Sequence, residues 1–178
     1  HFEVSYYESD SDFGERLTEV NGTWVGNREK TEIQGVEVTA DADLNDAHNL
    51  AFSYTYADGE SDTDGDGDVD TELSGINIAP ETLKLSWSAA WTKRLSSHLQ
   101  FTQFLDRDIE GDDLDFDGYG LVDGSMAYRT RAGKFSLGIE NLLDKDYFTY
   151  YSQSARVSDE YYFQGRGRTV TLGYQLDF

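Results

Sequence analysis

The residues of this chain that are best suited to chemistry are the carboxylates of one short acidic segment. Ca²⁺ selects hard oxygen ligands at loop positions 1, 3 and 5, with Gly at position 6. Position 12, where a bidentate Glu would close such a site, is Leu73, and Glu72 precedes it. The segment therefore predicts either a calcium site or an acidic, solvated loop. The candidate ligands stand at every second position: Asp62, Asp64, Asp66, Asp68 and Asp70, with Gly67 at the turn.

No other group of side chains suggests catalysis. The three histidines, His1, His48 and His98, are far apart in the sequence and stand at no metal-ligand spacing to one another. No Ser, His and Asp are grouped for nucleophilic attack, and carboxylates are so abundant that no pair of them stands out. We therefore expect a protein that is not an enzyme.

Composition limits the class of protein. The 178 residues carry a net charge of −21, which argues against a nucleic-acid partner because phosphate binding needs a basic surface. Twelve Tyr, ten Phe and three Trp argue against disorder. The sequence has no apolar run of the length of a membrane helix and no cysteine, which excludes disulfides and thiolate metal sites.

Strict alternation of apolar and polar residues predicts eight β-strands. The clearest is the strand at 83–91, where Leu85 and Trp87 face one side while Lys84 and Ser86 face the other. The last strand, 166–178, alternates in the same way and ends on an aromatic residue. The eight predicted strands lie around residues 2–6, 28–40, 50–57, 83–91, 99–105, 122–129, 135–139 and 166–178.

The connections between these strands alternate in length. Four are long, acidic and glycine-rich, and the three between them are short turns. Long loops on one side and short turns on the other are typical of antiparallel transmembrane β-barrels of the outer membrane, whose long loops are extracellular. The long connections are 9–27, 58–79, 107–118 and 144–165, and the turns lie near 44–47, 94–97 and 131–133.

Several motifs resemble one family of outer-membrane proteins. Residues 138–147 (GIENLLDKDY) are similar to the penultimate strand of TonB-dependent receptors, and residues 165–174 (GRGRTVTLGY) are similar to their closing strand. Residues 30–37 and 79–85 resemble strand openings in the same family. The resemblance implies an all-β, 22-stranded barrel plugged by an N-terminal domain, of which residues 1–178 are about the last eight strands.

This resemblance also implies a function. TonB-dependent receptors of Gram-negative outer membranes capture a scarce nutrient, most often a ferric siderophore, on extracellular loops. Rearrangement of the plug, driven from the inner membrane through TonB, then admits it. The plug and the segment that contacts TonB are absent from this chain. Within the aromatic segment 144–165, the resemblance points to Tyr150, Tyr151 and Arg156 as ligand-binding residues, and an interfacial aromatic girdle is the alternative for this segment.

Two further sets of residues have expected partners. Gly173, Leu176 and Phe178 resemble the C-terminal signal that the barrel-assembly machinery reads, although Leu172 stands where a polar residue is usual. Arg166 and Arg168 share the face of Val170, so we expect them to point outward at the outer rim. Lipopolysaccharide phosphates are their expected partners, and exposed arginines without a specific partner are the alternative.

Two other interpretations of the alternation remain open. A complete, small eight-stranded barrel with a structural or adhesive role requires a hydrogen-bonded ladder between residues 2–8 and 166–178. A soluble, calcium-stabilised β-sandwich fits the acidic loops but leaves the terminal Phe unexplained. The chain begins at His1 without a signal peptide and within a predicted strand, so we expect a piece of a larger barrel with two open edges.

Overall fold

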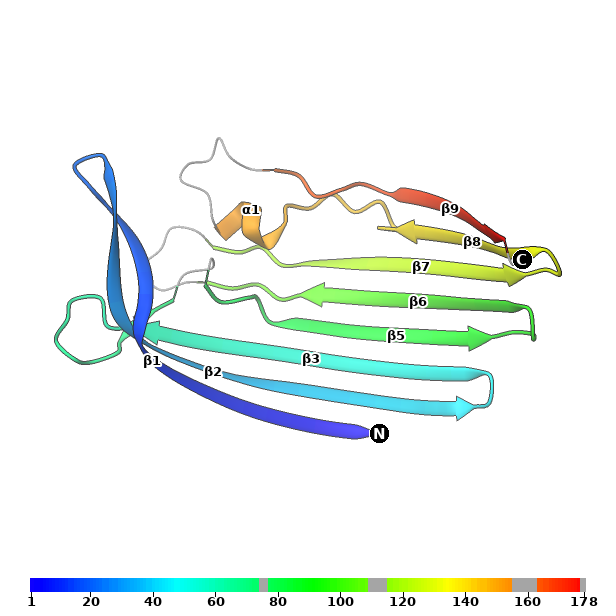
Figure 1. Ribbon diagram of the computed structural model, residues 1–178, viewed down its shortest axis with the longest axis horizontal. Coiled ribbons are helices and arrows are strands. Elements are labelled where there is room, and N and C mark those ends of the chain that lie inside the picture. The colour runs from blue at the N-terminus through cyan, green and yellow to red at the C-terminus, as the bar shows by residue number, and fades with distance from the viewer. Residues whose placement is uncertain (74–76, 109–114, 155–162, 177–178) are drawn as a thin grey trace.

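A computed structural model of the chain describes residues 1–73, 77–108, 115–154 and 163–176, and it confirms the predicted all-β, antiparallel architecture (Figure 1). Apart from one short helix, α1 (Tyr150–Ser154), the regular elements in these ranges are strands. No helix in these ranges has the length and hydropathy needed to cross a bilayer. The strands are β1 (Phe2–Val20), β2 (Thr23–Asn45), β3 (His48–Ser61), β4 (Thr71–Glu72), β5 (Thr82–Ala90), β6 (Leu95–Phe104), β7 (Tyr119–Arg129), β8 (Gly133–Glu140) and β9 (Thr169–Leu176).

All strands belong to one open sheet. Its order is β1-β2-β3-β5-β6-β7-β8-β9, and every neighbouring pair is antiparallel; the two-residue β4 adds to β3 beside this path. Within the described residues, β1 pairs with β2 alone and β9 with β8 alone, so the sheet forms an open wall (Figure 1). The ladder between residues 2–8 and 166–178 that a complete eight-stranded barrel requires is not formed in this part of the chain.

The strand register brings the alternating side chains together on two continuous faces. On the apolar face, Leu85 is 50% exposed and Leu172 is 80% exposed, which suits a surface that contacts lipid rather than water. One row across this face joins Ala42, Leu50, Trp87, Leu99, Gly124, Ile139 and Val170. The row beside it lies on the polar face and joins Asp43, Asn49, Ser88, His98, Ser125, Gly138 and Thr171.

The two ends of the sheet differ. At one end, called the turn end here, short connections at 45–48, 90–95 and 129–133 join the strands. At the other, called the loop end, the chain makes the long connections between β3 and β5, β6 and β7, and β8 and β9 (Figure 1). The three short turns and these three long connections fall where the sequence predicts them.

The first long connection is an exception, and the prediction of a loop at 9–27 is wrong. β1 and β2 continue through this region as a β-hairpin that closes at Asn21 and Gly22. Both residues have positive φ, 52° and 78°, which is the conformation that Asn-Gly turns adopt in hairpins. β2 has 23 residues, whereas about 9–11 suffice to cross a bilayer, so the hairpin extends well past the neighbouring strands. We call residues 11–31 the hairpin extension.

Among the described residues, the buried hydrophobic side chains gather at the loop end, apart from Ala89 of β5 near the turn end. Phe116 is 1% exposed and Ile78 is 3% exposed, and Tyr119 and Leu73 are also buried. Phe116 makes edge-to-face contacts with Tyr119 (6.0 Å between ring centroids) and with Tyr150 of α1 (4.8 Å). Tyr119 lies opposite Phe104 on the polar face, so this loop core sits over that face. The loop core thus holds together the β3–β5, β6–β7 and β8–β9 connections.

Candidate functional site

A cleft of about 700 Å³ opens on the polar face at the loop end. It lies between the hairpin extension and the segment that follows β3. Thr31 and Ser61 are paired on the polar face and form part of its wall. The full lining consists of Gly14, Glu15, Arg16, Trp24, Glu29, Thr31, Ile33, Ser61, Thr63, Thr71, Glu72, Leu73 and Asn77.

An ion pair holds one side of the cleft. Arg16 Nε donates to Glu29 Oε1 at 2.6 Å, and the Glu29 side chain is only 7% exposed. The same guanidinium donates through Nη2 to the carbonyl oxygen of Thr63 at 3.3 Å. Arg16 therefore fastens the hairpin extension to the segment after β3. A buried carboxylate such as Glu29 depends on this partner, because an uncompensated buried charge is strongly destabilising.

The other side of the cleft is joined to the loop core. Arg107 Nη2 donates to Glu72 Oε1 at 3.0 Å and to the carbonyl oxygen of Leu73 at 3.4 Å. The Arg107 side chain is only 12% exposed. Both walls are thus fixed by an arginine and a carboxylate before any ligand arrives, which is the preorganisation that binding sites use to limit entropic cost.

Several groups of the cleft remain accessible to a ligand. The Trp24 side chain is 58% exposed and offers an aromatic face. Glu15 is exposed and pairs with Arg28 in the hairpin ladder, on the face opposite to Gly14 and Glu29, so its side chain points away from the cleft. Thr63 and Thr71 share a hydrogen bond between their hydroxyls at 3.0 Å. An aromatic ring and hydroxyls suit the binding of a polar small molecule, and they do not form a catalytic arrangement.

Of the three predicted ligand-binding residues, Tyr150 and Tyr151 are described, and neither lines this cleft. Tyr150 packs in the loop core, and its hydroxyl donates to the carbonyl oxygen of Ile78 at 2.5 Å. Burial raises the pKa of Tyr150, and the nearby charge of Arg107 partly offsets that shift. Tyr151 projects outward and is 72% exposed. Arg156 lies outside the described residues.

The aspartate segment is only partly assembled as predicted. Oxygen atoms of Asp62, Asp64 and Asp66 all lie within 4.8 Å of one another, whereas Asp68 and Asp70 are not part of this group. Asp62 is 9% exposed, and its two oxygens accept the N–H groups of Gly65 (2.7 Å) and Gly67 (3.0 Å). The segment is thus organised by hydrogen bonds from its own backbone, and hard oxygen donors of this kind fit Ca²⁺.

Both predicted rim arginines have carboxylate neighbours within the chain. Arg168 Nη2 lies 3.3 Å from Asp144 Oδ2, and Arg166 Nη1 lies 3.6 Å from Glu140 Oε2. Their side chains are 47% and 74% exposed, so a phosphate can still reach them. Of the predicted assembly signal, Gly173 and Leu176 lie in β9, while Phe178 lies outside the described residues.

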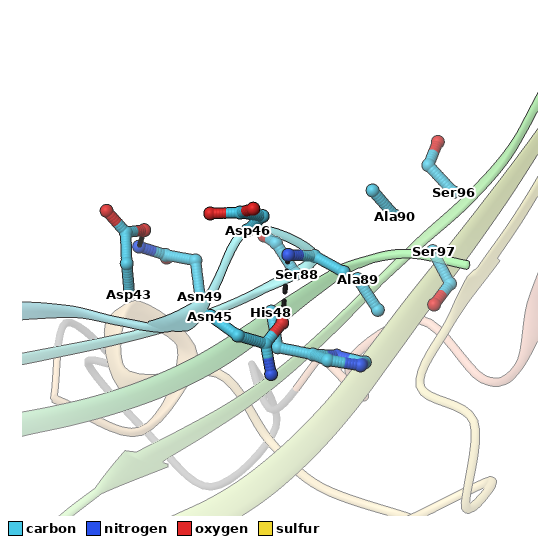
Figure 2. A pocket seen from close by; sticks show the side chains of 11 residues that line it. Asp43, Asn45, Asp46, His48, Asn49, Ser88, Ala89, Ala90, Ser96 and Ser97 are labelled. Atoms are coloured by element: carbon cyan, nitrogen blue, oxygen red, sulfur yellow. Dashed lines mark hydrogen bonds between the residues drawn. The ribbon is translucent and has the colours of Figure 1, made fainter. Parts of the chain in front are cut away.

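At the turn end, a shallower hollow of about 380 Å³ is lined by residues of the β2–β3 turn and of β5 and β6. Its polar contacts are internal: the amide of Asn49 donates to Asp43 at 3.0 Å (Figure 2) and to Asp41 at 2.9 Å. On the apolar face nearby, His48 stacks on Trp87, with ring centroids 5.7 Å apart. The hollow offers few free groups, so the cleft at the loop end is the better candidate site.

The residues that make this cleft cannot be recognised as a site from the sequence alone. Arg16, Trp24 and Glu29 fall in or next to the region expected to be a loop, and nothing in their spacing indicates that they converge. The only local signal was Asn21-Gly22, a dipeptide typical of tight hairpins.

An open antiparallel wall with one lipid-type face and one polar face defines the class of β-barrel membrane proteins. Comparison with known sequences specifies the family. The family described as "TonB dependent receptor-like, beta-barrel" matches residues 1–142, and the chain belongs to it.

Related proteins and solved structures agree with this assignment. The chain is 35% identical over 106 residues to the ferric aerobactin receptors of Escherichia coli and Klebsiella pneumoniae, a match that covers 54% of this chain and 14% of each receptor. The copper transporter OprC superposes with a TM-score of 0.77 at 23% identity, over 95% of this chain and 27% of OprC. The ferric-catecholate import receptor Fiu of E. coli K12 superposes with a TM-score of 0.64 at 19% identity, over 96% of this chain and 24% of Fiu.

Proposed function

We propose that residues 1–178 form the C-terminal part of the barrel wall of a longer TonB-dependent receptor. In this proposal the receptor takes up a scarce nutrient, a ferric siderophore, across the outer membrane of a Gram-negative bacterium. The observation that carries this proposal is the cleft at the loop end of the polar face. In a closed barrel the polar face lines the lumen and the loop end is extracellular, so a ligand in the cleft stands at the entrance to the lumen. The similar proteins are receptors and a transporter by name, which supports a transport role over a catalytic one.

The arrangement suggests how this wall takes part in uptake. The ligand first meets the hairpin extension and the loops, whose positions are fixed by the loop core and by the pairs Arg16–Glu29 and Arg107–Glu72. It then passes along the polar face toward the plug, whose rearrangement depends on TonB contacts made by the N-terminal region of the receptor. Tyr151 and Arg156 remain candidate contacts for the ligand on the β8–β9 connection.

Two further partners belong to this proposal. Arg166 and Arg168 are exposed enough to bind lipopolysaccharide phosphates, with Glu140 and Asp144 holding their side chains in place. The strand that carries Gly173 and Leu176, together with Phe178, is the proposed recognition signal for the barrel-assembly machinery.

The cleft can be tested by removing an exposed side chain that the fold does not need. In the receptor that contains this chain, Trp24→Ala should reduce uptake of an iron-55 ferric siderophore into iron-limited cells by about tenfold, since stacking on an aromatic face contributes on the order of 1 kcal/mol or more. Phe13→Ala is the matched control, because Phe13 lies on the same hairpin extension, is 70% exposed and does not line the cleft. Equal uptake by the two variants at equal surface levels would remove the cleft from the capture pathway.

A further inference from the structure

The cations of this acidic chain are unevenly distributed. The chain has 14 Lys and Arg residues against 35 Asp and Glu, yet residues 82–105 and 124–139 contain no Asp or Glu. These two ranges include the β5–β6 and β7–β8 connections, which lie at the same end of the sheet, the turn end (Figure 1). Five cations stand in or next to the two connections: Lys93, Arg94, Arg129, Arg131 and Lys134. The turn end over these strands is therefore basic in a protein of net charge −21.

Three of these cations lie at the tips of two tight turns. Residues 92–95 form the first turn and residues 130–133 the second, each closed by a backbone hydrogen bond between its end residues (3.2 and 2.8 Å). Lys93 and Arg94 are the two central residues of the first turn, and Arg131 is a central residue of the second. All three are exposed and lie beyond the last paired residues of the strands. They therefore belong to neither face of the sheet and are accessible at its rim.

No carboxylate in the described part of the chain neutralises these five cations. None of them forms an ion pair there, whereas Arg16 and Arg107 at the cleft each have a carboxylate partner. Arg129 and Lys134 stand opposite each other in the β7–β8 ladder, and like charges in such a pair destabilise a sheet. The N–H of Arg129 also donates to the carbonyl oxygen of Arg94 at 2.8 Å, which brings the two turns together. A bound anion would relieve the repulsion between these groups.

The apolar face next to the second turn is layered. Tyr128, Phe135 and Tyr174 form one row across β7, β8 and β9, directly beside the turn. The Tyr174 hydroxyl donates to the carbonyl oxygen of Ala132, at the tip of that turn, at 3.1 Å. The next row on the same face is aliphatic and consists of Met126, Leu137 and Leu172. From the tip inward the order is cation, aromatic ring and aliphatic chain, which is the order of residues at a membrane interface.

A groove of about 440 Å³ lies between these two rows, and all six of their side chains line it. Two of the strands that form it, β7 and β8, are joined by the turn that carries Arg131. A hydrocarbon chain in the groove therefore has its polar end beside a cation. Because the sheet presents this face to lipid, the groove and the tips together fit an amphiphile with an anionic head.

We infer that the turn end over β5–β9 binds an anionic phospholipid of the periplasmic leaflet. The phosphate accepts charge-assisted hydrogen bonds from the tip cations Lys93, Arg94 and Arg131, and one acyl chain lies in the groove. The short turns of outer-membrane barrels are periplasmic, so the tips lie at the headgroups of that leaflet. The inference goes beyond nutrient uptake and does not depend on which nutrient the receptor carries.

Arg129 and Lys134 contribute to the attraction without contacting the lipid. Each is adjacent in sequence to a residue of the aromatic row, so strand alternation turns its side chain to the polar face. From there the two cations raise the positive potential at the turn end. An acidic protein segment in the lumen would meet only these two, whereas an anionic lipid meets three tip cations and the groove.

Native mass spectrometry of the complete receptor in detergent tests this inference. The probes are phosphatidylglycerol and phosphatidylcholine with identical acyl chains, so they differ only in the headgroup. We expect the first phosphatidylglycerol to bind about tenfold more tightly than phosphatidylcholine at low ionic strength, and the preference to shrink as salt is raised. Equal affinity for the two lipids would overturn the inference.

Charge variants assign the preference to the tips. Arg131→Gln should reduce the preference severalfold, and Lys93→Gln, Arg94→Gln and Arg131→Gln combined should abolish it. Arg129→Gln is the matched control, because it removes the same charge two residues away but from the polar face. An effect of Arg129→Gln as large as that of Arg131→Gln would place the anion in the lumen and overturn the lipid assignment.

A second pair of variants tests the groove. Leu137→Trp puts a larger side chain into the groove and keeps the face apolar, so it should weaken phosphatidylglycerol binding severalfold. Leu99→Trp is the control, because Leu99 lies on the same apolar face, is 40% exposed and does not line the groove. Equal binding by the two variants would overturn the placement of an acyl chain in the groove.

Discussion

The loop end and the turn end of this sheet are built on the same eight-strand path but are stabilised in different ways. At the turn end, strands stop within a few residues of one another, and aromatic side chains such as Trp87 and Trp91 lie on the apolar face beside His48. At the loop end, the connections fold back over the polar face and bury Phe116 and Ile78 almost completely. The turn end therefore depends on its membrane surroundings, while the loop end carries a small core of its own.

This difference explains why the sheet looks poorly buried. Side chains such as Leu85 and Leu172 are half exposed or more because their natural neighbours are lipid chains, not other residues of the protein. The loop core, by contrast, is buried among other residues of the protein and obtains its stability from the hydrophobic effect. The cleft lies where the sheet meets the loop core. Its walls are therefore held by the loop core and by ion pairs, not by the bilayer.

The largest expected effect falls on the loop end. Phe116→Ala should cost about 3–5 kcal/mol of local stability, since it removes a fully buried aromatic side chain. Hydrogen exchange should rise sharply in the β3–β5 and β6–β7 connections and in α1, while β5 and β6 stay protected.

Phe163→Ala is the control for this variant, because Phe163 is 70% exposed. An increase in exchange throughout the sheet in Phe116→Ala would contradict the separation of the two regions.

The two faces of the sheet can be compared at adjacent positions of β5. Leu85→Arg places a charge on the lipid face and should cost roughly 2–4 kcal/mol, whereas Ser86→Arg points into the polar lumen and should be mild. The fraction of heat-modifiable, folded receptor on gels measures assembly. Equal losses for the two variants would show that the faces are assigned incorrectly.

The smallest expected effect concerns calcium at the loop end. If Asp62, Asp64 and Asp66 hold Ca²⁺, the dissociation constant should be about 10⁻⁴–10⁻³ M, as in other extracellular modules. Millimolar Ca²⁺ should then stabilise this segment by about 1 kcal/mol and leave the turn end unchanged.

Titration calorimetry on the receptor in detergent, compared with an Asp64→Asn and Asp66→Asn double variant, measures this binding directly. Indistinguishable calcium heats from the two proteins would leave the segment as a solvated acidic loop.

The sequence by itself determined the wall. Alternation in a strand such as β5 follows from having lipid on one side and lumen on the other, so each residue reports its face without reference to distant parts of the chain. The same local information placed the short turns and three of the four long connections. It also carried the resemblance to TonB-dependent receptors, and comparison with known proteins confirmed this family through a match over residues 1–142.

Only the tertiary structure decided the hairpin extension, the loop core and the cleft. Residues 9–27 show no alternation that marks them as strands, and the prediction of a loop failed there. Phe116, Ile78 and Tyr150 come from connections far apart in the sequence, and their contacts depend on the register of the strands that lie between them. The pairing of Arg16 with Glu29 depends in turn on the hairpin turn at Asn21 and Gly22. Local patterning is a property of each strand and its solvent, whereas a site built from several loops is fixed only when the whole sheet has formed.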